Sequence, residues 1–150
     1  MIKIICVGKV KEGFLNEAIL EYKKRISKYT KIEIFELPDF SYDVKKTLKE
    51  EYEKIMNVFD KKNFNILLDI SGKEMDSVSF AIKIEYELMT NGNITFIIGG
   101  SYGVLNELRD ICDMRLSFSK MTFPHQLFRV VLLEQIYRAF KINNNEEYHK

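Results

Sequence analysis

The sequence predicts one α/β domain, built on a mostly parallel sheet with helices on its faces. Short apolar runs that end at glycine or proline alternate with segments of helical spacing, and the connections between them are short. No repeat, linker or change of composition divides the 150 residues, of which 46% are hydrophobic. This is the size of one ordinary domain with enough apolar material for a core.

The first half of the chain contains two strands and two helices in alternation. Ile2–Val7 is a short β-branched run closed by a glycine, which is typical of a buried strand. Glu12–Tyr29 has apolar residues at helical spacing and a polar outer face. Lys31–Leu37 alternates loosely with charge and stops at a proline, so it predicts a second strand. After a loop, Val44–Phe59 returns to helical spacing.

The middle of the chain contains one clear strand and one ambiguous segment. Phe64–Ile70 is a third strand, which we expect to end at Ser71-Gly72. Apolar residues alternate strictly within Ser77–Leu88, which favours a strand, but Asn91-Gly92 resembles a helix C-cap. The segment is long for a strand, and the strand–helix order around it favours a crossover helix. We therefore expect a helix here.

The last elements follow the same alternation. Asn93–Ile98 is a strand that runs into the glycine-rich loop Gly99–Gly103. Leu105–Cys112 is a short helix, Arg115–Phe118 a short strand and Pro124–Phe140 a long helix. The tail that follows is polar, and such tails are usually frayed.

Composition restricts the class of protein. The 23 basic and 22 acidic side chains give a net charge of +1, so an RNA contact would need a local basic patch or a second subunit. No apolar run is long enough for a membrane helix, and the N-terminus does not resemble a signal peptide. Cys6 and Cys112 match no metal or redox spacing, and Cys6 is expected in the core. We expect a cytoplasmic protein without metal.

Three loops qualify as ligand sites because ligands of parallel sheets bind at the carboxyl ends of strands. They follow Leu68-Asp69-Ile70, Ile98 and Phe118. The loop Gly99–Gly103 matches neither a dinucleotide fingerprint nor a P-loop. Its glycines fit either a tight turn or the close approach of a ligand to the backbone, and local sequence does not separate the two.

The loop before the long helix has an unusual composition. Thr122 could cap that helix and Pro124 suits its first turn. Neither role explains Met121, Phe118 and Phe123, unless these side chains cover the end of the sheet or hold a flat apolar ligand. His125, in the first turn, is more often a capping or interface residue than a catalyst.

The long helix is apolar over much of its circumference, which predicts packing both on its own sheet and on a second copy of the chain. Glu134 and Arg138 are spaced to pair on one face. This spacing indicates either a simple helix ion pair or a site at a subunit boundary that contains Arg138.

Four stretches of the sequence resemble the RlmH family, the bacterial large-subunit rRNA pseudouridine N3-methyltransferases of the SPOUT superfamily. They are Phe96–Gly103, Leu116–Gln126 (L-S-F-S-K-M-T-F-P-H-Q), Arg129–Phe140 and Tyr148–Lys150. The resemblance extends to the start of the chain and covers its whole length. One departure is Asn145-Glu146-Glu147 before the tail tyrosine, where the family often has Gly-x-Pro.

The resemblance implies a C-terminal trefoil knot, S-adenosyl-L-methionine as cofactor, a homodimer, and a pseudouridine substrate in a hairpin loop of 23S rRNA in the assembled ribosome. Carried over by position, the cofactor-binding residues are Leu68, Gly99, Gly100, Phe118, Ser119, Lys120, Met121, Thr122 and Phe123. They fall on the three loops that the strand order already nominated.

The resemblance also implies a catalytic role for the tail. Tyr148 and His149 are expected to order over the site when RNA binds, with His149 assisting proton removal. Arg138 is expected to bind phosphate or the developing negative charge, and His125 is the second choice as a base. Two other interpretations are a nucleotide-binding α/β enzyme and a non-catalytic protein that binds the ribosome.

Overall fold

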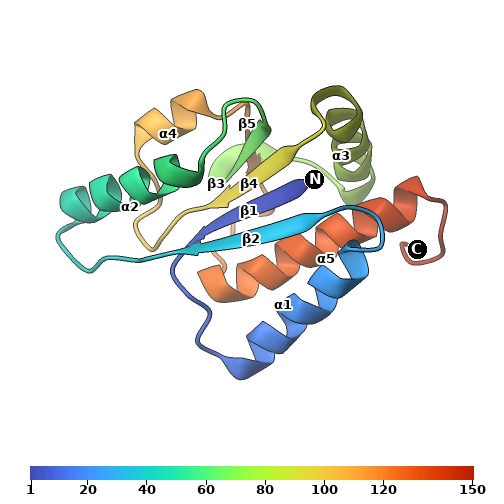
Figure 1. The fold of residues 1–150 in the computed structure, drawn as a ribbon, viewed down its shortest axis with the longest axis horizontal. Coiled ribbons are helices and arrows are strands. Elements are labelled where there is room, and N and C mark those ends of the chain that lie inside the picture. Colours follow the sequence, from blue (N-terminus) through green and yellow to red (C-terminus); the bar gives the residue numbers. More distant parts are fainter.

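The computed structural model describes residues 1–150, in which five strands alternate with five helices (Figure 1). The strands are β1 (Ile2–Val7), β2 (Ile32–Leu37), β3 (Phe64–Glu74), β4 (Ile94–Ile98) and β5 (Met114–Ser117). The helices are α1 (Gly13–Ile26), α2 (Val44–Val58), α3 (Ser77–Asn91), α4 (Asn106–Ile111) and α5 (His125–Asn143). Every predicted element is present, including the helix in the ambiguous segment. None of the helices is long and apolar enough to cross a membrane.

The strands form one sheet in the order β2-β1-β4-β3-β5, and every neighbouring pair is parallel. The predicted α/β fold with a parallel sheet is therefore confirmed. In this order β4, β3 and β5 are neighbours, so the loops that follow them emerge side by side at one edge of the sheet. The C-terminal trefoil knot stays a prediction.

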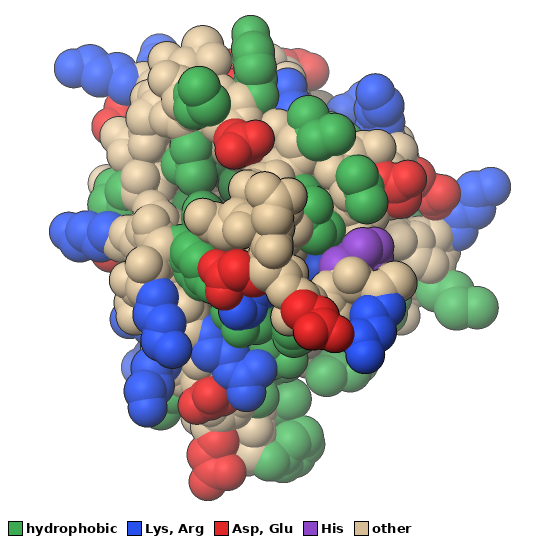
Figure 2. Space-filling view, turned by 90° about the vertical axis from the view of Figure 1, so that its right-hand side faces the viewer, with side chains coloured by type: hydrophobic (Ala, Val, Ile, Leu, Met, Phe, Trp, Pro, Cys, Tyr) green, Lys and Arg blue, Asp and Glu red, His purple; other side chains and the backbone are tan.

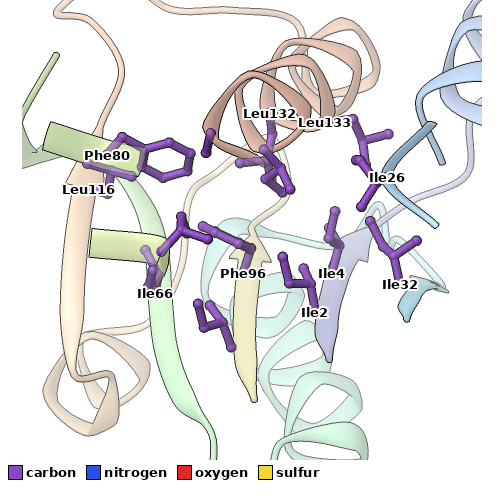
Figure 3. Close-up of a cluster of buried hydrophobic side chains, with 14 of the residues drawn as sticks. Ile2, Ile4, Ile26, Ile32, Ile66, Phe80, Phe96, Leu116, Leu132 and Leu133 are labelled. Atoms are coloured by element: carbon purple, nitrogen blue, oxygen red, sulfur yellow. The ribbon is translucent and has the colours of Figure 1, made fainter. Parts of the chain in front are cut away.

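The core lies on both faces of the sheet because side chains alternate along each strand. On β1, Ile2, Ile4 and Cys6 belong to the larger cluster, which also contains buried residues of α1, α3 and α5 (Figure 3). Ile5 and Val7 point the other way, into a smaller cluster with α2 and α4. The placement of Cys6 in the core is confirmed. The domain therefore has three layers, with the sheet in the middle.

Helix α5 is largely covered by other elements of the same chain. It packs between α1 and α3 on the larger core, and none of its residues after Leu127 is exposed. One chain thus covers much of its apolar surface but leaves Val130 and Val131 half-buried, and the homodimer stays a prediction.

Strand β3 differs from its prediction because it continues past Ser71-Gly72 to Glu74. Its register against β5 shifts between Leu68 and Lys73, which both pair with Leu116, so the intervening residues bulge out of the ladder. A Cβ atom on Gly72 would lie 2.7 Å from the carbonyl carbon of Arg115. The Ser-Gly signal therefore marks a bulge and a close approach of two strands, and the predicted strand end is wrong.

The start of α5 also differs from its prediction. Pro124 occupies the N-cap position, where its carbonyl accepts a hydrogen bond from the N–H of Phe128. No side chain caps the helix, and Thr122 is exposed. The predicted capping role of Thr122 is wrong, because it lies two residues before the N-cap, outside the position from which side chains reach the first N–H groups.

Candidate active site

The three segments that were predicted as strand-end loops line a cavity of about 290 Å³, although the first of them, at Leu68-Asp69-Ile70, lies within β3 at its bulge. Eight of the predicted cofactor-binding residues line it, namely Leu68, Gly99, Gly100, Phe118, Ser119, Met121, Thr122 and Phe123. Lys120 is exposed and does not line the cavity. The structure therefore brings together residues from β3, β4 and the segment before α5 because their strands are neighbours in the sheet.

The glycine loop is built for close packing. A Cβ atom on Gly99 would lie 2.6 Å from Cγ1 of Val104, and one on Gly100 would lie 2.7 Å from Oε2 of Glu51. Gly103 has a φ of 77°, in the left-handed region that favours glycine. Gly103 thus serves the turn, whereas Gly99 and Gly100, which also line the cavity, let the loop pack closely against Val104 and Glu51.

Aromatic side chains form another wall. The ring of Phe118 meets that of Phe128 edge-on at 5.0 Å between centroids, and Phe123 stacks on Phe128 at 5.7 Å. Phe118 also packs on Phe80 of the core. The aromatic residues of this loop therefore cover the end of the sheet and line the cavity at the same time. Such a wall suits a flat, mostly apolar ligand group.

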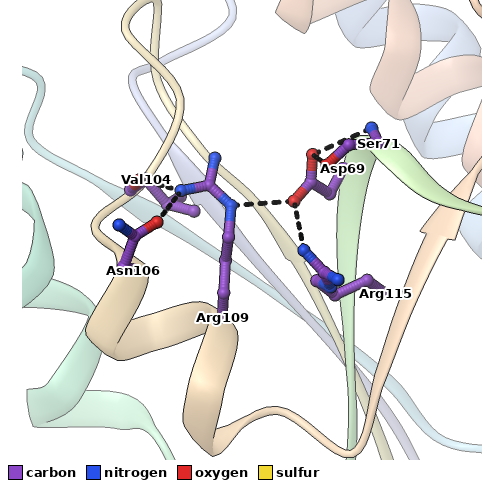
Figure 4. A network of polar contacts seen from close by, with 6 residues as sticks. All are labelled: Asp69, Ser71, Val104, Asn106, Arg109 and Arg115. Carbon is purple, nitrogen blue, oxygen red and sulfur yellow. Dashed lines mark hydrogen bonds and ion pairs between the residues drawn. The ribbon is translucent and has the colours of Figure 1, made fainter.

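Two charged residues at the cavity were not predicted. Asp69 follows the buried part of β3, and its Oδ2 lies 2.9 Å from Nε of Arg109 in α4 (Figure 4). Burial raises the pKa of the Asp69 carboxyl, but hydrogen bonds from Arg109 and Ser71 outweigh this and hold it below its usual range. An acidic residue at the end of an apolar strand was a signal for Asp69. No local pattern marks Arg109.

His125 also lines the cavity. Burial lowers the pKa of its imidazole below the ordinary 6.5, and the positive charge of Arg129 adds to the effect. The side chain is therefore neutral at pH 7. It does not cap α5, so the roles at an interface and as the second choice of base stay predictions.

The C-terminal tail folds back on α5 and brings the predicted catalytic residues together. Glu134 accepts hydrogen bonds from Nη2 of Arg138 at 2.6 Å and from the hydroxyl of Tyr148 at 3.0 Å. Nη1 of Arg138 lies 3.0 Å from Nδ1 of His149, and its guanidinium lies over the Tyr148 ring. Burial and the bond to Glu134 raise the pKa of Tyr148 to about 12. The pairing of Glu134 with Arg138 is confirmed, and the tail is held rather than frayed.

A second cavity, of about 470 Å³, adjoins the first. His149 and Gln135 line it, and it shares Leu116, Phe118 and Phe123 with the cavity of the strand-end loops. The tail cluster and the glycine loop therefore lie on opposite sides of one largely aromatic wall. Nowhere in the chain do three or more histidine, cysteine, aspartate or glutamate side chains gather in a way that could hold a metal ion.

Solved structures resemble this fold. A probable methylase family protein from Haemophilus influenzae Rd KW20 matches 99% of this chain and 70% of its own with a TM-score of 0.59, at 16% sequence identity. The SpoU methyltransferase AviRb from Streptomyces viridochromogenes matches 97% of this chain and 61% of its own with a TM-score of 0.50, at 10% identity. At these identities the likeness concerns the fold.

Sequence comparison assigns the family. The family model described as "Predicted SPOUT methyltransferase" matches residues 1–149. Proteins named ribosomal RNA large subunit methyltransferase H from Clostridium botulinum and Ruminiclostridium cellulolyticum are 50% and 46% identical to this chain. Each comparison covers 99% of both chains. The chain therefore belongs to the SPOUT methyltransferase family, among the proteins named ribosomal RNA large subunit methyltransferase H.

Proposed function

We propose that this protein transfers the methyl group of S-adenosyl-L-methionine to N3 of a pseudouridine in a hairpin loop of 23S rRNA, in the assembled ribosome. The observation that carries the proposal is the pair of adjoining cavities. One is formed by the three strand-end loops, and the other is lined by His149 of the tail. The names of its relatives, which are ribosomal RNA methyltransferases, support the substrate class.

The first cavity fits the cofactor. Its aromatic wall around Phe118 and Phe123 suits the adenine ring, and the backbone of Gly99 and Gly100 offers N–H and C=O groups free of side chains. Arg109 supplies a positive charge at the same cavity. When bound, the sulfonium supplies a methyl group that is already electrophilic. The chain therefore needs to orient the reactants rather than activate the donor.

The N3 imide of pseudouridine is protonated at neutral pH, so the reaction requires that this proton is removed, and we assign its removal to the residues of the tail. A guanidinium has no acceptor, so Arg138 donates to Nδ1 of His149, and the remaining proton of a neutral His149 ring lies on Nε2. Neither ring nitrogen is then free to accept a proton. For His149 to act as a base its ring has to leave Arg138, which agrees with a tail that reorders when RNA binds.

The guanidinium of Arg138 is fixed in an orientation that suits anion binding. Its Nε and Nη2 are 3.1 and 2.6 Å from the Oε1 atom of Glu134, which fixes the plane of the guanidinium. Nη1 is released once His149 moves, and it can then donate to an RNA phosphate or to the imide anion. Tyr148 donates to the same Glu134 and keeps the tail anchored during this change.

The experiment that tests this function is single-turnover methylation of ribosomes by a His149→Ala variant. We expect the rate to fall by about 100-fold or more, as for loss of a general base. Binding of S-adenosyl-L-methionine, measured by calorimetry, should stay unchanged because His149 does not line the first cavity. Lys150→Ala, which alters the neighbouring tail residue, is the control. An unchanged rate in His149→Ala would reject the role of His149.

A homodimer belongs to the same proposal. The outer face of α3 exposes Val78, Ile82, Tyr86 and Met89, with exposed fractions between 43% and 81%. Val78 also lines the second cavity beside His149. A second copy seated on this face would place the tail cluster at a subunit boundary, which is one of the two roles predicted for Arg138.

A further inference from the structure

Arg109 is the one lysine or arginine among the residues that line the first cavity. It projects from α4, a helix that contributes no other residue to that lining. His125, the other basic side chain of the lining, is held neutral by burial and by the nearby Arg129. The permanent positive charge of the cavity therefore belongs to Arg109.

Part of the guanidinium is committed to the protein. Nε donates to Oδ2 of Asp69 at 2.9 Å, and Nη1 donates to the carbonyl of Val104 at 2.8 Å and to Asn106 at 2.9 Å (Figure 4). These partners come from the bulge of β3, the residue after the glycine loop and the start of α4. The group is thus fixed in orientation by three separate segments of the site.

The remaining nitrogen, Nη2, donates no hydrogen bond within the chain and carries two N–H groups. A Cβ atom placed on Gly103 would lie 3.7 Å from Nη2, and Gly103 itself lines the cavity. Because residue 103 has no side chain, access to Nη2 from the glycine loop stays open. The free donors are therefore next to the space in which the cofactor would lie.

The charge around Arg109 favours an anion. The side chain of Asp69 is only 6% exposed and faces two guanidinium groups, that of Arg109 at 2.9 Å and that of Arg115 at 3.9 Å. One carboxylate between two cations leaves a net positive charge at this side of the cavity. A carboxylate that meets Nη2 forms a charge-assisted hydrogen bond, which is among the stronger kinds in proteins.

We propose that Nη2 of Arg109 binds the carboxylate of the methionyl part of S-adenosyl-L-methionine. The inference rests on the proposed function, because it takes this cofactor as the ligand of the cavity. The carboxylate is the only anionic group of that ligand, while the aromatic wall on Phe118 and Phe123 suits its adenine. Arg109 then selects ligands that keep the complete amino-acid end.

The test compares S-adenosyl-L-methionine with its decarboxylated form, which lacks only the carboxylate. We expect Arg109→Met to weaken binding of the intact cofactor by roughly 10-fold to 100-fold, the range for a hydrogen bond to a charged group. Binding of the decarboxylated form should change by less than about twofold in the same calorimetric titrations. Arg109→Lys should recover part of the difference because it restores the charge.

The matched control is Arg115→Met, since Arg115 faces the same Asp69 but does not line the cavity. It should change the ratio of the two affinities far less than Arg109→Met does, because Arg115 adds charge at a distance but no donor within the cavity. Equal weakening of both ligands by Arg109→Met, in a protein whose circular dichroism spectrum is native, would overturn the inference and make Arg109 a support of the loop. Failure of the unaltered protein to bind the intact cofactor would instead reject the proposed function and the inference with it.

Discussion

At the scale of single residues, Glu51 shows how the glycine loop is supported. This carboxylate of α2 is 4% exposed, its Oε2 has no hydrogen-bond partner, and it lies directly against Gly100. Burial raises the pKa of Glu51 above its ordinary value of 4.5, and the charge of Asp39 adds to the rise, while a hydrogen bond from the backbone of Phe40 opposes it. The glycine loop therefore packs against the Glu51 carboxylate, which is poorly solvated when it is ionised.

A pH dependence follows. Because the pKa of Glu51 is higher in the folded state, its protonated form favours folding, and that contribution is lost as pH rises above about 4.5 through the folded pKa. The Glu51→Gln variant cannot lose this contribution. The difference between its free energy of unfolding and that of the unaltered protein should therefore become more favourable to the variant as pH rises from 4 to 7. A pKa difference of one unit corresponds to about 1.4 kcal/mol.

Urea denaturation at several pH values measures this, with Glu53→Gln on the exposed side of the same helix as control. The free energy of unfolding of Glu53→Gln should depend on pH in the same way as that of the unaltered protein. If Glu51→Gln instead became less stable relative to the unaltered protein as pH rises, the direction of the pKa shift would be contradicted.

At the scale of elements, α3 has two apolar faces. Phe80, Ala81 and Ile84 are buried against the core, whereas Val78 and Ile82 belong to the exposed stripe on the outer side. The double pattern explains why the sequence of this helix also alternates like a strand. A helix that is apolar on both sides is usually covered on both sides.

Ile82→Glu should therefore weaken a homodimer, because it places a charge in the middle of the stripe. We expect the dissociation constant of the dimer to rise at least about tenfold, which corresponds to 1.4 kcal/mol. Sedimentation equilibrium measures it. Asn57→Glu, which adds the same charge at an exposed position of α2, should have little effect because α2 covers the other face of the sheet. A monomeric unaltered protein would refute the dimer itself.

At the scale of the whole molecule, the charge distribution bears on how RNA is engaged. The net charge is +1, and on the face seen in Figure 2 basic and acidic side chains are interspersed around the edge. The last turn of α1 carries Lys23, Lys24 and Arg25, but Arg25 is paired with Glu21. Phosphate attraction supplies most non-specific affinity for nucleic acid, so we expect this near-neutral protein to bind free RNA weakly.

Intact large ribosomal subunits should consequently be a far better substrate than the protein-free hairpin, by about 100-fold or more in initial methylation rate. The physical reason is that a composite ribosomal surface has to supply the contacts that this near-neutral domain lacks. Incorporation of a labelled methyl group into each RNA at equal concentration measures the ratio. Comparable rates on both substrates would show that the domain recognises RNA by itself.

Hydrophobic period and turn residues determined most of the fold. The alternation of apolar runs with helical spacing located all ten elements, because a strand or helix must bury one face and its pattern shows which. The aromatic segment before α5 was marked because its composition does not suit an ordinary connection, whereas the glycine loop suited a tight turn as well as a ligand site. The motifs shared with the family then indicated the tail residues Tyr148 and His149 as part of the site.

Only the tertiary structure decided what depends on neighbours distant in sequence. The strand order sets β3 between β4 and β5, and this makes three separate loops into one cavity. The bulge after Leu68 depends on pairing with β5, and the pair of Asp69 and Arg109 depends on the position of α4. The sequence pattern carries local preference, but strand pairing and charge pairing are settled by which segments the folded chain brings into contact.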